Sequence, residues 1–436
     1  MSARIGIRRE DKSKWERRVP IIPKHASKLQ EEHDIEVWVQ PSDIRVFRDQ
    51  AYDKAGVPLQ EDLSECPIVF GVKEMPADFF DRGHTYIFFA HVIKGQPHNM
   101  PMLQSMLDKG CQLIDYEKVT GARGQRLIFF GHHAGLAGMV DTLWAFGQRL
   151  KNEGITNPFS ELKQMVEYDG LEEANAAISA VGKRIAQDGL PQSIAPLICG
   201  FAGYGNVFGG ANEIIELLPV EEIEPDQVAD VAKRNDARGV IYKVVFREED
   251  TVEPISPDSA FELQDYYDHP EKYRSRFGAC LPYLTLLVNC VYWEEKYPRL
   301  VTKEFLRELY RETMQPRLRV IGDVSCDIEG AIEATVKCTE PGNPVYVYDP
   351  FEDRAIDGVA GRGPVILAVD ILPSELPREA STYFSSVLMD YVPAIAKTDY
   401  SVPFEELDLP PEIKRAVIVY QGELTPDYRY LKEHLP

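Results

Sequence analysis

Short apolar runs alternate with polar stretches along the first part of the chain. The runs "RIGIR", "IEVWV", "CPIVFGVK", "TYIFFAHV", "CQLIDYE" and "RLIFFG" have the length and the β-branched and aromatic content of buried strands. Polar segments between them, such as "HNMPMLQSMLDKG", are compatible with helices. This alternation predicts an α/β domain with a largely parallel sheet.

A second α/β pattern follows. The segment "HHAGLAGMVDTLWAFGQRLKNEG" has apolar residues at helical spacing and closes with Gly154, which predicts a long connecting helix. Next, "SIAPLICGFAGYGNVFGGANEIIELL" predicts a strand, a glycine-rich turn and an amphipathic helix, and further strands are predicted in "GVIYKVVF", "LTLLVNCVYW", "RLRVIGDVS" and "GPVILAVD". The acidic, Tyr-rich segment 224–283 is read as an insertion or long loops. Finally, "PREASTYFSSVLMDYVPAIAK" is helix-like and is expected to return to the first domain.

The composition narrows the class of protein. The 436 residues are 44% hydrophobic and 27% charged, as in ordinary globular proteins, and no apolar run approaches the length of a membrane span. A formal net charge of −22 disfavours nucleic acids and anionic membranes as partners. With no leader-like N-terminus, we expect a soluble cytoplasmic protein. The seven cysteines have no metal-ligand spacing, so free thiols and no metal site are expected.

Ionisable side chains follow several predicted strands of the first domain. Lys73 ends one run, His91 and Lys94 follow the next, a third ends in residues 115–117, and Arg18 lies in "WERRVPIIP" after the first. In open α/β sheets, ligands bind beyond the carboxyl ends of the strands. The N-terminal stretch is also basic, with eight Lys or Arg against three acids among residues 1–24. It is either a solvated basic edge or a mouth that attracts a small acidic ligand.

The glycine-rich turn "CGFAGYGNVFGGA" is a candidate dinucleotide site. Gly203, Gly205 and Gly209 depart from the G-x-G-x-x-G spacing by one residue, and Asn206 and Val207 open the following helix. A turn between an apolar strand and a helix favours a pyrophosphate site over a purely structural turn.

Acids after the next predicted strand bear on the choice of cofactor. Glu222 and Glu224 stand where an acid would bind a ribose 2′-hydroxyl, which suits NAD(H). Lys233 and Arg234, farther on, could instead meet a 2′-phosphate. The residues alone leave both cofactors open.

Several motifs together resemble a known family. They are "IGIRREDKSKWERRVPIIPKH", "FGVKEMP", "FFAHVIKGQ", "LIDYEKV", "FGHHAGLAGMVD", "FAGYGNVFGGANEI", "HPEKYRSRF", "DVSCDIEG" and "VDILPSELPREAS". In this order they resemble the lysine-ketoglutarate reductase module of the aminoadipic semialdehyde synthases. More distantly, the chain is similar to the lysine-forming saccharopine dehydrogenases and to the alanine dehydrogenase/transhydrogenase group.

This resemblance implies an α/β fold of two Rossmann-like domains with mainly parallel sheets and an interdomain active-site cleft. A substrate-binding domain is expected over residues 1–135 and 372–436, and a dinucleotide-binding domain over residues 136–371. The implied reaction condenses the ε-amine of L-lysine with 2-oxoglutarate and reduces the imine to saccharopine with NAD(P)H, NADP(H) being favoured by the resemblance. A separate glutamate-forming saccharopine dehydrogenase is an expected partner.

The resemblance also carries over individual roles. Lys73 and His91 match the acid–base pair. Residues that match substrate contacts are Arg18, Lys94, Glu117 and Arg126. Two strand-end acids that fall on family motifs, and are counted with the cofactor residues, are Asp323 and Asp370.

The residue types suit this chemistry. We expect neighbouring cations at His91, Lys94 and Arg18 to lower the pKa of Lys73 toward neutrality, so that it can accept a proton from the substrate amine. Arg18 and Arg126 suit the two carboxylates of 2-oxoglutarate, because a guanidinium binds a carboxylate through two parallel hydrogen bonds. Two alternatives stay open: reductive coupling of another amine with a 2-oxo acid, and a nucleotide-binding regulator without turnover.

Overall fold

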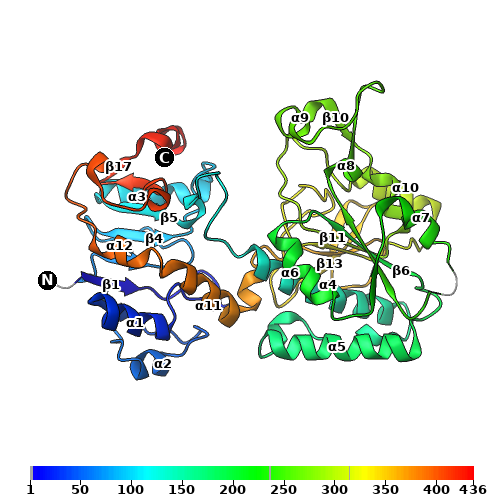
Figure 1. Cartoon of the computed structure of the whole chain (residues 1–436), viewed down its shortest axis with the longest axis horizontal. Coiled ribbons are helices and arrows are strands. Elements are labelled where there is room, and N and C mark those ends of the chain that lie inside the picture. Colours follow the sequence, from blue (N-terminus) through cyan, green and yellow to red (C-terminus); the bar gives the residue numbers. More distant parts are fainter. Residues whose placement is uncertain (1–2, 235–236, 314) are drawn as a thin grey trace. The chain divides into compact units, whose positions relative to one another are not determined.

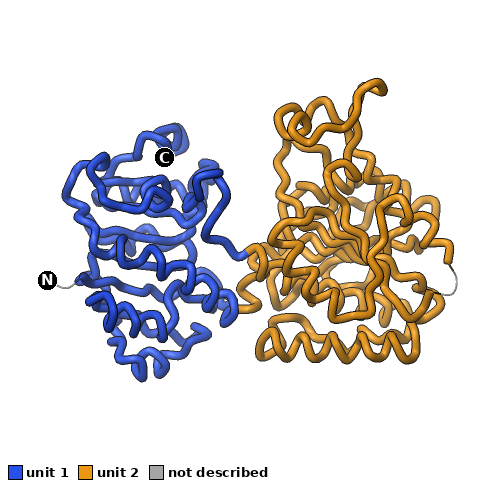
Figure 2. Tube along the Cα trace, in the orientation of Figure 1, with its two compact units in different colours: residues 1–130, 377–436 blue, residues 131–376 orange. Residues whose placement is uncertain are grey.

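The computed structural model describes residues 3–234, 237–313 and 315–436, which form two compact units (Figure 2). Unit 1 comprises Met1–Phe130 and Pro377–Pro436, and unit 2 comprises Gly131–Leu376. Each unit is built on one mainly parallel sheet with helices, which confirms the predicted fold class. The substrate-binding and dinucleotide-binding domains expected from the sequence, with their boundaries, stay a prediction.

The sheet of unit 1 has seven strands in the order β17-β16-β5-β4-β3-β1-β2 (Figure 1). Their bounds are β1 Ala3–Ile7, β2 Ile35–Val39, β3 Ile68–Phe70, β4 Thr85–Phe88, β5 Gln112–Asp115, β16 Val417–Tyr420 and β17 Glu423–Leu424. Strands β1 to β5 are parallel, and β16 pairs antiparallel with β5. The C-terminal segment therefore supplies one edge of the N-terminal sheet.

The short apolar strands of unit 1 are buried on both faces. In β3, Ile68 and Phe70 join a core with helices α1 (Pro23–His33) and α12 (Val392–Lys397), whereas Val69 joins a second core with α3 (Met100–Asp108). Successive side chains of a strand point to opposite faces, so a continuous apolar run fits a sheet covered on both sides.

Two predictions for unit 1 were wrong in detail. The run "RLIFFG" is not a strand: Ile128 is buried, and Phe130 stacks on Phe384 with ring centres 4.7 Å apart, so these residues fill the core from a loop. The helix predicted over 377–397 is two helices, α11 (Pro377–Leu388) and α12. Pro393 lies in the first turn of α12, where its missing N–H is tolerated, and it disfavours a helix running through the preceding residue.

The sheet of unit 2 has eight strands in the order β14-β13-β15-β12-β11-β6-β8-β7. Their bounds are β6 Leu197–Ala202, β7 Val220–Glu222, β8 Ile241–Phe246, β11 Leu286–Asn289, β12 Val320–Asp323, β13 Val345–Asp349, β14 Arg354–Asp357 and β15 Val365–Leu367. All pair in parallel except β13 and β14. The strands predicted around β6, β8, β11, β12 and β15 are confirmed.

Helices cover the unit 2 sheet. The predicted connecting helix is α4 (Gly131–Asn152), and the helix after the glycine-rich turn is α6 (Asn206–Ile215), which lies against α4 (Figure 1). The polar helix α5 spans Leu171–Asp188. Within 224–283, beyond β8, a two-stranded sheet of β9 (Val252–Pro254) and β10 (Tyr273–Ser275) forms a small separate core, as expected for an insertion.

Candidate functional site

Lys73 and His91 lie at the same carboxyl edge of the unit 1 sheet. Strands β3 and β4 are neighbours in register, with Phe70 opposite Ile87, and the pairing continues as the N–H of Phe89 donates to the carbonyl of Val72 (3.0 Å). Lys73 and His91 each stand three residues beyond their strand. The structure therefore brings these two predicted residues to one edge.

Glu74 holds His91. The imidazole Nδ1 lies 2.7 Å from Oε1 of Glu74, and the other carboxylate oxygen accepts a hydrogen bond from Nζ of Lys12 (2.8 Å). Burial disfavours the charged carboxylate, but the hydrogen bonds and charges of His91 and Lys12 outweigh it, so the pKa of Glu74 lies far below its usual range. Glu74 is therefore a partly buried anion that orients the imidazole.

His91 also has an unusual backbone conformation. Its φ of 47° lies in the left-handed region, which residues with a Cβ rarely adopt. The side-chain amide of Asn99 donates to the carbonyls of His91 (3.0 Å) and Ala90 (3.2 Å), and so fixes this turn. Such local strain clusters at functional sites, where the surroundings hold it in place.

Glu10 fixes the turn that carries Lys73. Its buried carboxylate accepts the backbone N–H of Val72 (2.7 Å) and that of Lys73 (3.0 Å). Burial is the main cause that raises the pKa of Glu10 to about 7, and the nearby charge of Glu16 adds to it. The segment after β1 is thereby tied to the turn that carries Lys73.

The pKa of the half-buried Lys73 is lowered, in the expected direction. Burial is the largest cause, followed by the positive charge of Arg18, while Glu16 and Glu74 oppose the shift. The sequence alone predicts crowding by cations including His91 and Lys94 as the cause. In the structure, desolvation of the ammonium is the larger effect.

Arg18 forms a buried ion pair. Its Nε and Nη2 donate to the two carboxylate oxygens of Glu16 at 2.7 Å and 2.5 Å, and both side chains are only 3% exposed. The guanidinium carbon lies 4.4 Å from the ring centre of Phe130. This predicted substrate clamp is thus already engaged by a carboxylate of its own chain.

Glu117 and Arg126, the remaining predicted contacts, are also paired with each other through Nη2 of Arg126 and Oε1 of Glu117. The arginine side chain is 49% exposed and the glutamate 13%. Lys94 is exposed, and no hydrogen bond or ion pair joins its side chain to another described residue. In the described part of the chain, the side-chain contacts of Glu117 and Arg126 thus join these two residues to each other and not to Lys73 or His91.

Five of the eight cations in the basic N-terminal stretch form ion pairs with nearby acids. Its ion pairs are Arg4 with Glu36 and Glu65, Arg8 with Asp11, Arg9 with Glu61, Lys12 with Glu74 and Arg18 with Glu16. Most of these cations are therefore paired, and a mouth that attracts a small acidic ligand stays a prediction. The acids that matter most at the site, Glu10, Glu16 and Glu74, were missed by the sequence analysis, although two of them lie beside predicted cations in "WERR" and "GVKEMP".

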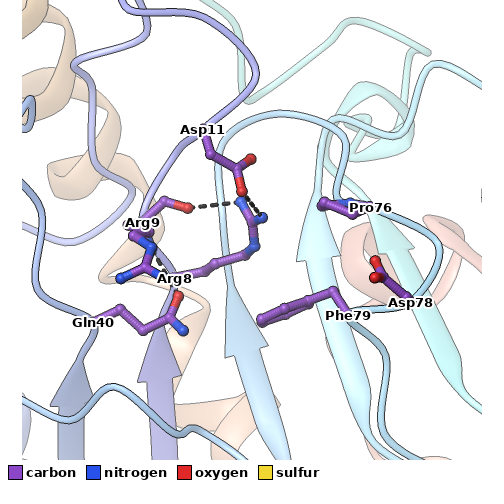
Figure 3. Close-up of a pocket in the computed structure, with 7 residues that line it drawn as sticks. All are labelled: Arg8, Arg9, Asp11, Gln40, Pro76, Asp78 and Phe79. Atoms are coloured by element: carbon purple, nitrogen blue, oxygen red, sulfur yellow. Dashed lines mark hydrogen bonds and ion pairs between the residues drawn. The ribbon is translucent and has the colours of Figure 1, made fainter.

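A pocket of about 230 Å³ lies at the same sheet edge (Figure 3). It is lined by Arg8, Arg9, Asp11, Gln40, Pro76, Asp78 and Phe79, which follow β1, β2 and β3. Arg8 lies over the ring of Phe79 with its guanidinium carbon 4.7 Å from the ring centre. The predicted catalytic residues do not line this pocket.

The glycine-rich turn of unit 2 leaves open space at the start of α6. Gly203 has a φ of 92°, and a Cβ there would lie 3.1 Å from the carbonyl oxygen of Cys290. Gly205 precedes Asn206 and Val207, and a Cβ on Gly205 would meet nothing within 4 Å. An open backbone at a helix N-terminus fits a pyrophosphate.

The later glycines differ in role. A Cβ on Gly210 would lie 2.0 Å from the carbonyl oxygen of His132 in α4, so this glycine permits the close crossing of α4 and α6. A Cβ on Gly209 would make only ordinary contact, 3.7 Å from His132 Nδ1. Gly210, and not Gly209, is therefore the glycine that the helix contact requires.

The acids predicted near the cofactor occupy different surroundings. Glu222 pairs with Lys243 (2.9 Å), whereas Glu224 is exposed. Asp323 ends β12, is buried, and accepts hydrogen bonds from Asn289 (2.8 Å) and Thr335 (2.5 Å).

Burial raises the pKa of Asp323 to about 7. Asp370, beyond β15, is exposed. Asp323 therefore fixes the ends of two neighbouring strands, while Asp370 and Glu224 are open to solvent.

Within the described residues, no helix combines the length and apolar character that crossing a bilayer requires.

Comparisons with known proteins agree with this architecture. Two family models match, "Alanine dehydrogenase/PNT, N-terminal domain" over residues 6–137 and "Alanine dehydrogenase/PNT, C-terminal domain" over residues 285–427. Among solved structures, an L-alanine dehydrogenase aligns with a TM-score of 0.62 over 99% of this chain and 100% of its own, at 16% identity. The transhydrogenase from Sinorhizobium meliloti aligns with a TM-score of 0.54 over 97% and 99% of the two chains, at 14% identity.

Curated relatives match nearly the whole chain. The alpha-aminoadipic semialdehyde synthase of Arabidopsis thaliana is 37% identical over 98% of this chain and 41% of its own length, and the mitochondrial one of Rattus norvegicus is 37% identical over 98% and 47%. The chain thus spans less than half of these relatives. The "Saccharopine dehydrogenase [NAD(+), L-lysine-forming]" of Emericella nidulans is 28% identical over 81% of this chain and 82% of its own. The resemblance expected from the sequence is confirmed.

Proposed function

This chain belongs to the alanine dehydrogenase/PNT family, and within it we propose an NAD(P)H-dependent oxidoreductase that condenses the ε-amine of L-lysine with 2-oxoglutarate and reduces the imine to saccharopine. The observation that carries the proposal is the joint placement of Lys73 and His91 on one sheet edge, with His91 held by Glu74. The 37% identity to an aminoadipic semialdehyde synthase over 98% of the chain supports it.

The first chemical demand is a neutral amine. A free lysine amine has a pKa of about 10.4, so roughly one molecule in 2,500 is nucleophilic at pH 7. Lys73, whose own pKa is lowered by burial and by Arg18, is suited to accept that proton. His91, held by Glu74, is suited to deliver the proton that lets the carbinolamine hydroxyl leave as water.

The second demand is the recognition of two carboxylates and an ammonium. We assign the carboxylates of 2-oxoglutarate to Arg126 and Arg18, and the α-ammonium of lysine to Glu117. Arg126 is half exposed and can bind a carboxylate while it keeps Glu117, whereas Arg18 is 3% exposed and must partly release Glu16. Lys94 is retained as a fourth contact, because an exposed ammonium can turn toward an acidic substrate.

The cofactor residues lie in unit 2. Gly203, Gly205, Asn206, Val207 and Gly209 are proposed to hold the pyrophosphate, because the backbone at Gly205 is open. A reduced nicotinamide, when bound, supplies the hydride for the imine. The exposed Glu224 suits the ribose of NAD(H), whereas the resemblance favours NADP(H). Titration with both cofactors measures which of the two the protein prefers. Asp370 and Asp323 are proposed to flank the bound dinucleotide.

Substitution of the acid–base pair tests the proposal. Lys73→Met and His91→Gln should each lower kcat by about 10²-fold or more, because proton transfer is lost while the fold is retained. Lys24→Met and His98→Gln change exposed residues of the same types and should leave kcat unchanged. Rates near that of the unsubstituted enzyme for both Lys73→Met and His91→Gln would refute the assignment.

A panel of substrates separates the alternatives. NADPH and NADH oxidation should be fast with lysine plus 2-oxoglutarate, and slow with ornithine, polyamines or ammonia. A different preferred amine would support the related coupling reaction, and dinucleotide binding without any oxidation would support the regulator.

We also propose that the chain works in the cytoplasm and passes saccharopine to a separate glutamate-forming saccharopine dehydrogenase. The rat relative is named as mitochondrial, so fractionation of cells that express the tagged chain is the direct test. Saccharopine that accumulates when the separate enzyme is removed would support the partner.

A further inference from the structure

Two cysteines meet at the carboxyl edge of the unit 2 sheet. The Sγ atoms of Cys326 and Cys338 lie 3.9 Å apart, and all seven cysteines of the chain are free thiols. Cys326 follows β12 by three residues, and Cys338 lies in the segment that leads to β13. A disulfide needs the two sulfurs at about 2.05 Å, so the exposed Cys338 side chain must move toward Cys326 when the bond forms.

The backbone sets this proximity. The carbonyl oxygen of Ala368, just beyond β15, accepts a hydrogen bond from Sγ of Cys326 (3.2 Å) and another from the N–H of Thr339 (2.9 Å). Cys326 and the neighbour of Cys338 are therefore anchored on one atom of a third segment. The contact of the two thiols follows from the fold and not from a chance position of two loops.

The two thiols are chemically unequal. Cys338 is exposed, and its hydrogen bond with Cys326 lowers its pKa, while the same bond and burial raise the pKa of the half-buried Cys326. An accessible thiolate beside a protected thiol is the arrangement of an attacking and a resolving cysteine. Burial raises the pKa of the other cysteines, which are Cys66, Cys111, Cys199, Cys280 and Cys290.

We propose that Cys326 and Cys338 are a redox-active pair that a low-molecular-weight disulfide, such as oxidised glutathione, converts to an intramolecular disulfide. The Cys338 thiolate attacks one sulfur of the reagent, forming a mixed disulfide and releasing one thiolate. Cys326 then loses its proton and attacks Sγ of Cys338, releasing the second thiolate. The cysteines lose two electrons and two protons, and the reagent gains them as two thiols.

The disulfide would restrict the movement of residues 326–338, which contact the end of β12. Thr335 lies between the two cysteines, and its hydroxyl donates to the buried Asp323 at the end of β12 (2.5 Å). Closing residues 326–338 into a covalent loop restricts the movement of Thr335 away from Asp323. This inference stands on the thiol geometry and does not depend on the proposed reaction.

Thiol counting and mass spectrometry on the full chain test the pair. After incubation with oxidised glutathione at pH 8, the protein should lose two of its seven thiols, carry no adduct, and yield a peptide that joins Cys326 to Cys338. Dithiothreitol should restore all seven thiols. Cys326→Ser should instead keep glutathione bound at Cys338, and Cys338→Ser should react at least tenfold more slowly.

Cys280→Ser is the matched control, because Cys280 is half-buried in a different segment, and this variant should still lose two thiols. Retention of all seven thiols by the unsubstituted protein, a persistent adduct at Cys338, or a linked peptide between other cysteines would each overturn the proposal. The peptide map is made on the unsubstituted protein. It therefore tests for the Cys326–Cys338 disulfide even if one of the variants fails to fold.

Discussion

At the scale of single residues, the candidate site combines basic side chains with carboxylates, two of which pair directly with His91 and Arg18. Lys73, His91 and Arg18 could be predicted from the sequence, because strand-end cations and their motifs are visible in it. Glu10 could not, because its carboxylate binds backbone N–H groups at Val72 and Lys73, far along the chain. An acid in a charged stretch is normally solvated. The burial of Glu10 depends on the pairing of β1 with β3, which the local sequence does not show.

The pair of Glu16 and Arg18 gives a prediction on stability. Glu16→Gln leaves a 3% exposed guanidinium without a carboxylate, so the free energy of unfolding of unit 1 should fall by about 3 kcal/mol. Arg18→Met should cost a similar amount, and the double variant clearly less than the sum. Urea unfolding of the four proteins measures this cycle. Additive losses would mean that the two groups do not stabilise each other.

Asp115, the last residue of β5, gives a prediction on pH. It is buried, its Oδ2 has no hydrogen-bond partner among the described residues, and burial raises its pKa to about 7. The folded state therefore binds this proton more tightly than the unfolded state, and stability is lost as pH rises from about 4 to about 7. Asp115→Asn should add about 2 kcal/mol at pH 8 and nothing at pH 4.

Chemical unfolding at the two pH values measures the effect of Asp115→Asn. Asp427→Asn, at an exposed position, is the control and should change neither value. A gain that is equal at both pH values would exclude titration of Asp115 as its cause.

At the scale of elements, apolar runs predicted the parallel strands well, because strands buried on both faces are continuous apolar segments. The same reasoning failed for "RLIFFG", whose apolar residues fill the core from a loop. It also did not identify the antiparallel strands β13, β14, β16 and β17, of which β14 and β17 have half-exposed, polar residues whereas β13 and β16 are buried. An apolar run therefore predicts that its side chains are buried. It forms a strand only where its backbone can hydrogen-bond to a neighbouring strand.

The crossing of α4 and α6 gives a prediction that separates packing from ligand binding. Gly210→Ala would place a methyl group 2.0 Å from a carbonyl of α4, so unit 2 should lose about 3 kcal/mol of stability. Gly205→Ala meets no atom within 4 Å, so Tm should stay unchanged, while the Kd for NAD(P)H should rise about tenfold because the backbone is covered. Thermal unfolding and fluorescence titration measure both. An unchanged Kd of Gly205→Ala for NAD(P)H would mean that the glycine-rich turn does not bind the cofactor.

At the scale of the whole molecule, the titration of buried carboxyl groups and the net charge of −22 act together. Burial raises the pKa of Glu10 and Asp323 to about 7 and that of Asp141 to about 6, so their contribution to stability falls as pH rises toward 7. The pKa values of Glu16 and Glu74 are lowered, so their contribution is lost only as pH falls below about 4.

We therefore expect maximal stability at mildly acidic pH. Tm should be about 5 °C higher at pH 5.5 than at pH 8. Added salt should raise Tm more at pH 8, where the net negative charge is larger and self-repulsion is screened. Scanning calorimetry at both pH values, at low and high salt, measures this. A higher Tm at pH 8 would mean that the buried carboxyl groups find counter-charges at neutral pH.

The pairing of β16 with β5 has a consequence for the order of events during synthesis. The two strands stand about 300 residues apart in the chain, so a ribosome completes all of unit 2 before the partner of β5 emerges. Until then the backbone groups along one side of β5 have no strand to bind, and such an open edge invites association with other chains. A nascent chain of this protein therefore needs its central unit to fold early, or a chaperone to cover that edge.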